Sequence, residues 1–527
     1  MNDIIIVGAG TAGCVLAERL TSSGKFRVLL IEAGGKPSSP FVKMPAGFAK
    51  LFKSKLDWKF ESEPQTAANG RRIFTPRGKM LGGSSNMNAQ IHQWCHPADY
   101  DEWVAAGATG WGWEDVAPIF RAQECWRGEE TNGTRGRSGP MMVSPNVNAH
   151  QLSKAFVAAA RAAGLGDQPH YNGDAFEGAW LTELAHKDGQ RFSAFDAYLK
   201  PAMQRANVEV IREAQVLRVE IANGRATGVT VRQAGVEKTF SARGVILAAG
   251  AFGSPQVLML SGIGPAAALK KLGIPVYYDA PEVGENLQDH PMAPVIFLTR
   301  GTDTFKKAES PANLLRYLFL KRGMLASNAV EAFAFTRSNG AAATAPDVEL
   351  ILAPFHWNNQ GLEAPKVDAV SIGVAVVAPR SRGSLRLRSS NPLDAPLIDF
   401  ALLTDPEGRD AAATLAGARL ARKIATLSPL AEMVDKEFYP GADINDDSEL
   451  LARLTTQIQT VYHPTSTCRM GADPRSVVDP NLRVRGVDSL WVADASVMPA
   501  VPRGHPNAVV AMIAYRAAEM IAAKLTV

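Results

Sequence analysis

The sequence IIIVGAGTAG at residues 4–13 decides the fold class, because it leads a buried strand through a glycine-rich turn into a helix. The glycines let the backbone turn sharply after the strand and approach a pyrophosphate group. A helix expected over residues 12–21 would direct its N-terminal amides at the same phosphates. This spacing predicts a Rossmann-like α/β domain that binds an adenine dinucleotide.

An acidic residue further along the chain supports this interpretation. Glu32 closes a second apolar run, residues 28–31, at the place where a carboxylate accepts hydrogen bonds from the adenosine ribose. The carboxylate would repel the 2′-phosphate of NADP. The segment leaves NAD and FAD as alternatives.

Length and composition limit the class of protein. The chain has 527 residues, of which 46% are hydrophobic, and is long enough for two packed domains. Its formal charge of +4 is small and its basic residues are scattered, so nothing suggests nucleic acid or an anionic membrane as a partner. The first strand begins too early for a secretion signal, and no apolar run of about 18 residues could span a bilayer. We therefore expect a cytoplasmic protein without a transmembrane segment.

The cysteines and histidines give no sign of a metal. The four cysteines, Cys14, Cys95, Cys125 and Cys468, form no close pair, and no histidine and carboxylate cluster has metal-ligand spacing. We therefore expect no metal, and chemistry supplied by an organic cofactor.

Motif order suggests a discontinuous domain. Two further buried strands, over residues 244–250 and 489–493, end in small residues or at Asp494, and helices are expected from Ser254 to Leu260 and over 508–525. We assign residues 1–150, 201–300 and 458–527 to the dinucleotide domain. Residues 151–200 and 301–457 would form a substrate-binding domain built on an antiparallel sheet flanked by helices, with strands at 370–377 and 383–387.

Four other motifs complete the pattern. They are RGKMLGGSSNMNA at residues 77–89, GAFGSP at 250–255, VGENLQDH at 283–290 and HPTSTCRMG at 463–471. With the first motif, they closely resemble the glucose-methanol-choline (GMC) oxidoreductases, FAD-dependent enzymes that oxidise alcohols. The resemblance runs from Ile4 to the C-terminal helix and implies FAD rather than NAD.

The resemblance implies a set of cofactor-binding residues. The ADP half of FAD would be held by Gly8, Gly10, Thr11, Ala12, Gly13 and Glu32, and Val216 would lie beside the adenine. The loop against the flavin would contain Gly82, Gly83, Asn88 and Ala89. The remainder of FAD would contact Asp494, Ala495 and Asn507. Met87 stands where some members attach FAD through a histidine, which implies non-covalent FAD. His92 and His96 are interpreted as polar lid residues rather than attachment points.

The same resemblance implies the catalytic pair His463 and Asn507. A histidine suits a general base because its ordinary pKa, about 6.5, lies near working pH. His463 would take the hydroxyl proton of a primary alcohol while a hydride passes to flavin N5, and Asn507 would hydrogen-bond the alcohol oxygen or cap the last helix. His505 is an alternative proton acceptor, although a loop residue two positions away often faces the opposite direction.

The sequence indicates the alcohol substrate and the electron acceptor less closely than the cofactor. Glu331 and His356 are candidate pocket residues besides His505, although both residue types are more often structural at such positions. The product would be an aldehyde, and the electrons would pass to oxygen or a quinone-type carrier. The alternative is a hydroxynitrile-lyase-like protein that uses the same fold without redox chemistry.

Overall fold

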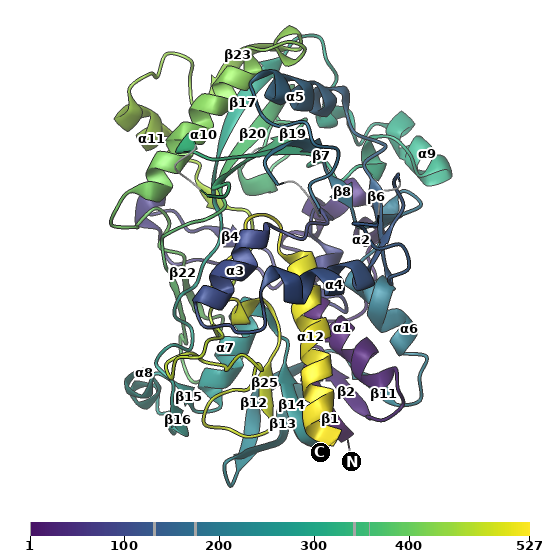
Figure 1. Cartoon of the computed structure of the whole chain (residues 1–527), viewed down its shortest axis with the longest axis vertical. Coiled ribbons are helices and arrows are strands. Elements are labelled where there is room, and N and C mark those ends of the chain that lie inside the picture. The colour runs from purple at the N-terminus through teal and green to yellow at the C-terminus, as the bar shows by residue number, and fades with distance from the viewer. Residues whose placement is uncertain (1, 130–132, 173–175, 341–343, 358, 527) are drawn as a thin grey trace.

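The computed structural model describes residues 2–129, 133–172, 176–340, 344–357 and 359–526. The chain forms two halves, each built on a seven-stranded sheet. In Figure 1 the N- and C-terminal ends lie together at the bottom of the molecule, and helix α12 (Asn507–Thr526) rises from there to the middle. The α/β architecture confirms the predicted fold class.

The lower sheet is mainly parallel. Its strands, in spatial order, are β11 (Val208–Ile211), β2 (Val28–Ile31), β1 (Asn2–Val7), β14 (Val236–Leu247), β13 (Arg225–Gln233) and β12 (Ala214–Ala222), and β25 (Leu490–Val492) also pairs with β14. Ile5 lies opposite both Leu29 and Val245, and all three are fully buried. Burial on both faces explains why these strands read as continuous apolar runs. Only β12, β13 and the first half of β14 form an antiparallel extension.

Helices α1 (Thr11–Thr21) and α12 pack against each other in this half, and α7 (Gly250–Leu260) follows β14. Helix α7 begins at Gly250 rather than at the predicted Ser254. The carboxylate of Asp494 explains the earlier start, because it accepts bonds from the backbone N–H of Gly250 and the hydroxyl of Ser254.

The upper sheet is antiparallel throughout. Its strands are β23 (Val434–Tyr439), β17 (Pro291–Thr299), β20 (Ala369–Val376), β19 (Val348–Ala353), β18 (Ala332–Thr336) and β7 (Gly178–Leu181), and β24 (Gln459–Thr460) pairs with β17. Helices α5 (Gln151–Ala162) and α10 (Arg409–Ala425) cover one face with an apolar core (Figure 1). The other face carries the buried rings of Phe333 and Phe335.

Three sequence-based details differ from the structure. Strand β17 belongs to the upper sheet although it falls inside the segment 201–300, and Tyr198 and Leu199 pack into the lower core although they fall inside 151–200. The strand predicted at 383–387 does not join the strand at 370–377. It forms β21 (Ser384–Arg386), which pairs with β22 (Leu397–Asp399), because the backbone of residues 383–385 bonds to that of residues 284–287.

Shorter elements connect these layers. The helices are α2 (Pro40–Lys43), α3 (Pro97–Ala105), α4 (Trp113–Gln123), α6 (Lys200–Ala202), α8 (Ala266–Lys271), α9 (Pro311–Leu320) and α11 (Asp447–Thr455). The short strands are β3 (Phe60–Glu61), β4 (Phe74–Thr75), β5 (Glu124–Trp126), β6 (Met141–Pro145), β8 (Glu183–Leu184), β9 (His186–Lys187), β10 (Gln190–Arg191), β15 (Ile263–Gly264) and β16 (Tyr278–Asp279).

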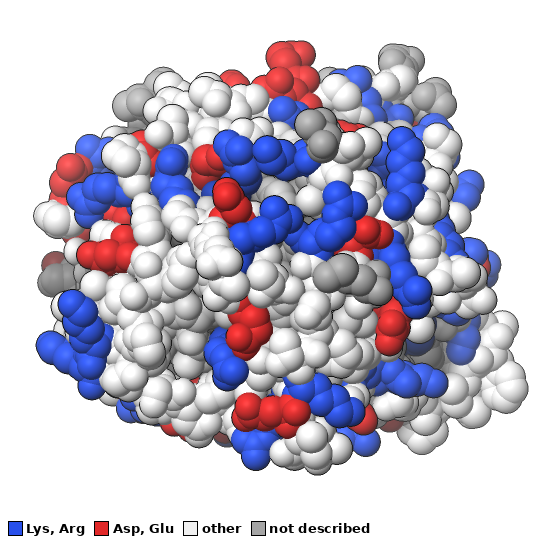
Figure 2. All heavy atoms as spheres, turned by 90° about the horizontal axis from the view of Figure 1, so that it is seen from below, with Lys and Arg blue, Asp and Glu red and all other residues white. Residues whose placement is uncertain are grey.

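Basic and acidic side chains both occur on the lower face, and the basic ones cover more of it. Figure 2 shows basic and acidic side chains interspersed with uncharged ones on the side seen from below. Within the described part of the chain, no helix has the length and apolar character needed to cross a membrane.

Candidate active site

One cavity extends from the carboxyl end of β1 to the face of the upper sheet opposite α5 and α10. Its lining includes Gly8, Glu32 and Val216 from the lower half, Gly83, Asn88 and Ala89 from the loop after β4, and Met292, Ile351, His463 and His505 near the upper sheet. Residues more than 400 positions apart in the chain, such as Glu32 and His463, therefore border the same space.

Close backbone approaches form the lower end of this cavity. A Cβ atom on Gly13 would lie 1.9 Å from the carbonyl oxygen of Gly8, so α1 can approach β1 only if residue 13 is glycine. A Cβ atom on Gly83 would lie 2.7 Å from Cα of Gly10, which places the second glycine loop directly on the first. A Cβ on Gly10 would meet nothing within 4 Å. The backbone of Gly10 is thus open to a ligand, as a pyrophosphate site requires.

Glu32 is fixed at the end of β2. One carboxylate oxygen accepts the N–H of Ala9 at 2.9 Å, and the other accepts the N–H of Gly34 at 2.7 Å. Burial raises the pKa of Glu32, while these two hydrogen bonds act in the opposite direction. Each carboxylate oxygen can accept a second bond, so the side chain is ready for ribose hydroxyls.

Most of the predicted cofactor residues border the cavity. The residues that line it are Gly8, Gly10, Thr11, Ala12, Glu32, Gly83, Asn88, Ala89, Val216, Asp494, Ala495 and Asn507. Gly13 and Gly82 are not part of the lining, but they shape the two glycine loops. Asp494 bonds to Gly250, Ser254 and Ser496, so its carboxylate holds the cavity wall together. The open glycine backbone, the positioned carboxylate and the continuous cavity fit a dinucleotide such as FAD.

A pair of histidines stands at the upper end. Nδ1 of His463 lies 3.0 Å from Nδ1 of His290, and the backbone N–H groups of both residues donate to Oδ1 of Asp289 at 2.8 Å. Burial, with additional effects of His505, His290 and Arg77, lowers the pKa of His463 well below its usual value. Burial also raises the pKa of Asp289 to about 7 and lowers that of His290 to about 3. His463 is therefore a neutral imidazole at pH 7, with Nε2 left for the cavity.

The structure brings His505 to His463 and bonds Asn507 to the start of α1. The two imidazole rings lie 5.0 Å apart at 84°, and Nε2 of His505 lies 2.9 Å from Oε1 of the fully buried Glu349. Asn507 instead begins α12, and its Oδ1 accepts the hydroxyl of Thr11 at 2.7 Å. This bond directs the Asn507 side chain to the first glycine loop, because α12 and α1 meet there.

Two predicted substrate residues lie outside the cavity lining. Glu331 is fully buried and accepts bonds from the backbone of His150 and the hydroxyls of Ser153 and Ser327, so it fixes the start of α5. His356 accepts a backbone N–H from Lys366 and packs on Phe438. Its neighbour Trp357 lines the cavity instead.

The two histidines considered as attachment points are also structural. His96 caps α3 through the N–H of Ala98, and the imidazole of His92 lies 3.4 Å from the buried carboxylate of Glu124. Met87 does line the cavity. Within the described residues, no group of three or more histidine, cysteine or carboxylate side chains is placed to hold a metal ion.

Sequence reasoning gave no individual role to three residues of this site, although two of them end the motif at residues 283–290. Asp289 and His290 are adjacent polar residues directly before the apolar strand β17, and Glu349 interrupts the apolar strand β19. A carboxylate within an apolar strand is a usable signal, because acidic side chains are almost never fully buried unless they are paired. The pairing of Glu349 with His505 links residues 156 positions apart, so the sequence could not show it.

A dinucleotide cradle that opens into a histidine-lined cavity defines a dinucleotide-dependent oxidoreductase. Models for the N- and C-terminal parts of the GMC oxidoreductases match residues 2–292 and 379–514. The chain belongs to the GMC oxidoreductases, which use FAD and act on the CH–OH groups of alcohol-type substrates.

Individual relatives cover nearly the whole chain. It is 42% identical to an uncharacterized GMC-type oxidoreductase of Mycobacterium tuberculosis strain H37Rv, over 99% of both chains. It is 38% identical to the alcohol dehydrogenase [acceptor] of Pseudomonas putida, covering 100% of this chain and 96% of that protein. Among solved structures, pyridoxine 4-oxidase from Mesorbium loti matches with a TM-score of 0.91 and 31% identity, over 98% of this chain and 99% of the other.

Proposed function

We propose that the protein binds FAD non-covalently and oxidises a primary alcohol to an aldehyde, with His463 as the general base. The observation that carries this proposal is the Nδ1–Nδ1 contact of His463 with His290 at 3.0 Å, which leaves Nε2 of a neutral imidazole for the cavity. Non-covalent binding is supported by Met87, which lines the cavity where a histidine attachment would be needed.

The residues have separate roles in this proposal. Nε2 of His463 accepts the hydroxyl proton, and Nδ1 retains its hydrogen through the bond to His290. Nε2 of His505 lies 2.9 Å from Oε1 of Glu349, and this contact fixes the His505 ring beside His463 at the cavity, where it shapes the place of the alcohol. Bound FAD supplies the acceptor for the hydride. Asn507 steadies the first glycine loop through Thr11, a cofactor-side role in place of the predicted contact with alcohol.

The cavity wall favours apolar or aromatic alcohols over sugars. Its lining includes the side chains of Phe48, Phe52, Met292, Ile351, Trp357 and Val461. A polar substrate would lose hydration against such a wall without regaining hydrogen bonds. We propose oxygen or a quinone-type carrier as the final electron acceptor.

Anaerobic reduction of the bound flavin tests the proposal. The purified holoenzyme is mixed without oxygen with aryl, aliphatic, amino and polyol primary alcohols, and the visible flavin band is followed. Bleaching by aryl or long-chain aliphatic alcohols is the expected result, and rapid recovery on admission of air would identify an oxidase. Bound FAD that no alcohol reduces would refute the redox function and favour a lyase. Flavin retained by the precipitated protein in acid would refute non-covalent binding.

A further inference from the structure

Helix α9 exposes an unusual amount of apolar surface. Leu314, Leu315, Leu318, Phe319 and Leu320 are 41%, 54%, 51%, 80% and 63% exposed. The other large apolar side chains of comparable exposure in the described residues come from separate segments of the chain. A contiguous apolar patch of this kind marks a binding surface rather than ordinary surface composition.

Four of the five exposed residues share one side of the helix, and Leu320 lies on the other side. Leu314 and Leu318 are one turn apart, as are Leu315 and Phe319, so the four form a stripe. The opposite side is attached to the molecule by Tyr317, whose ring is buried and whose hydroxyl donates to the carbonyl of Lys43 at 3.3 Å. The stripe therefore points away from the core to which the helix is attached.

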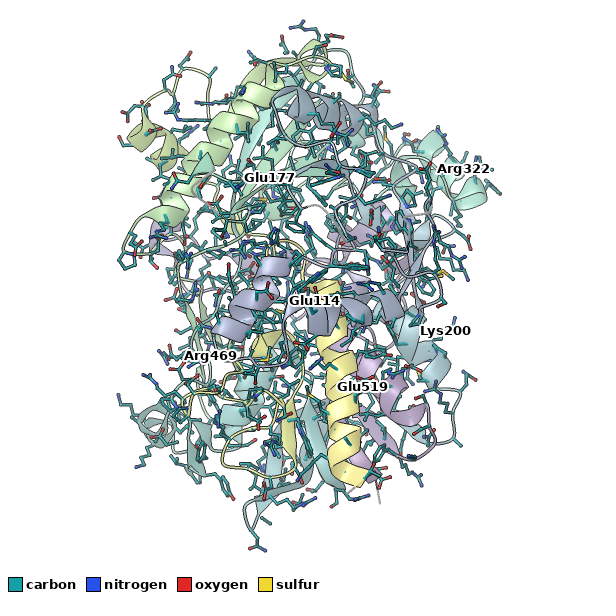
Figure 3. The ribbon with its side chains drawn as sticks, viewed as in Figure 1. Glu114, Glu177, Lys200, Arg322, Arg469 and Glu519 are labelled. Carbon is teal, nitrogen blue, oxygen red and sulfur yellow. The ribbon has the colours of Figure 1, made fainter. Side chains whose placement is uncertain are left out.

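The helix and the two residues that follow it carry charge of one sign. Residues 311–322 contain no acidic residue and three basic ones, Arg316, Lys321 and Arg322. Figure 3 shows Arg322 at the outer edge of the molecule, next to α9. The ammonium group of Lys321 lies 4.7 Å from the centre of the Tyr317 ring. Apolar and basic side chains on one surface helix match the acyl and phosphate layers of an anionic bilayer.

We propose that α9 docks the protein on an anionic lipid surface, with Leu314, Leu315, Leu318 and Phe319 inserted among the lipids and the basic residues Arg316 and Arg322 at the phosphates. A second copy of the chain fits less well. A two-fold contact through α9 would bring the same basic residues face to face, which costs electrostatic energy. The small net charge of the chain gave no reason to expect an anionic membrane as a partner. The proposed binding depends instead on the few basic residues in and next to α9.

The position of α9 relates the lipid surface to the cavity. Tyr317 packs in an apolar cluster with Phe48, Val330 and Trp357, and these three residues also line the cavity. The docked helix would thus place one cavity wall beside the bilayer, where apolar alcohols and quinones are concentrated. The docking itself does not depend on the proposed chemistry, since it is measured as binding.

Vesicle sedimentation of the FAD-loaded full chain tests this proposal. We expect binding to vesicles of equal parts phosphatidylcholine and phosphatidylglycerol, weaker binding to phosphatidylcholine alone, and a marked loss in high salt because the charges are screened. The double variant Leu318→Ser/Phe319→Ser should lower vesicle affinity at least about tenfold, given the hydrophobic free energy of two such side chains.

A matched control variant tests whether vesicle binding depends on α9 or on exposed apolar side chains in general. The double variant Leu393→Ser/Phe438→Ser removes a leucine and a phenylalanine that are 46% and 48% exposed elsewhere, and should bind vesicles like the unaltered protein. Lys321→Glu/Arg322→Glu should lose binding only on the anionic vesicles. No vesicle binding, or equal loss in the control, would overturn the proposal. A dimer seen by sedimentation velocity without vesicle binding, and abolished by Leu318→Ser/Phe319→Ser, would assign α9 to a second copy.

Discussion

His463 and His290 share a hydrogen bond between their Nδ1 atoms, 3.0 Å apart, and their rings meet at 87°. Both are neutral at pH 7, because burial lowers the pKa of His463 well below its usual value and that of His290 to about 3. A neutral imidazole has one donor and one acceptor nitrogen, so one ring donates and the other accepts. If Nε2 of His463 is to accept a proton, Nδ1 must carry hydrogen and His290 must accept it. His290 thus positions the base by fixing its tautomer.

Replacing His290 should therefore impair His463 without removing it. We expect His290→Phe to retain FAD and to slow anaerobic flavin reduction at least about tenfold, a part of the 10²–10⁴-fold that a general base contributes. His290→Asn, whose amide oxygen accepts hydrogen bonds, should keep more of the rate. Stopped-flow reduction over a range of pH measures both variants. An unaltered rate and pH profile for His290→Phe would show that the contact is only structural.

Removing the base itself should have a larger effect. His463→Ala should bind FAD normally but reduce it at least about a hundredfold more slowly. Equal reduction rates in His463→Ala and the unaltered enzyme would refute the assignment.

The pH profile of the unaltered enzyme gives a second measure of the base. A base works only when deprotonated, so activity falls as pH drops through its pKa. Because burial lowers the pKa of His463, reduction should stay constant from pH 8 to below pH 6.5, the ordinary histidine value. Because the pKa of Asp289 is raised to about 7, the same profile is measured for Asp289→Asn, and a loss of rate centred at or above pH 6.5 in both proteins would indicate an ordinary, exposed base.

His505 and Asn507 should give different phenotypes. His505→Ala should slow flavin reduction, because the ring that lies 5.0 Å from His463 is lost, with little change in FAD affinity. Asn507→Ala should mainly weaken FAD binding, because the bond from Thr11 at the start of α1 is lost. Reduction rates at saturating FAD and FAD titrations of the apoprotein separate the two effects. The reverse pattern would restore the sequence-based assignment of Asn507.

The sequence predicted local motifs better than contacts between them. The strand, glycine turn and helix at residues 4–21 follow from a pattern that is continuous in the chain, and β1 and α1 formed as expected. The position of Glu32 directly after β2 was predicted for the same reason. His505 lies in the loop just before α12, and Asn507 is the first residue of that helix. Only the direction of each side chain decides which of the two reaches His463. That direction depends on Glu349 from β19 and Thr11 from α1, which no local pattern reveals.

The same limit explains the substrate residues. Glu331 and Glu349 are both acidic residues beside or within apolar strands, and both are fully buried. Glu331 is satisfied by the start of α5, whereas Glu349 reaches a histidine at the cavity. The sequence around Glu331 and Glu349 is similar, and their roles differ only because β18 and β19 pack against different neighbours.

Two glycines of the first motif should respond differently to alanine. Gly10 has φ −70° and ψ −165°, ordinary values for any residue, and its added Cβ would meet no protein atom within 4 Å. Gly10→Ala should therefore leave the thermal midpoint of the apoprotein unchanged or slightly raised, because alanine restricts the unfolded chain. Its methyl group would occupy space at the cavity, so FAD affinity should fall at least about tenfold, the equivalent of 1.4 kcal/mol.

Gly13→Ala is the matched comparison. Its Cβ would lie 1.9 Å from the carbonyl oxygen of Gly8, so α1 must move away from β1. We expect this variant to lose thermal stability in the apoprotein as well as FAD affinity. Differential scanning calorimetry of both apoproteins and FAD titration by flavin fluorescence measure the two properties. If Gly10→Ala bound FAD as tightly as the unaltered protein, the open backbone at Gly10 would not face the cofactor, and the pyrophosphate would have to lie elsewhere in the cavity.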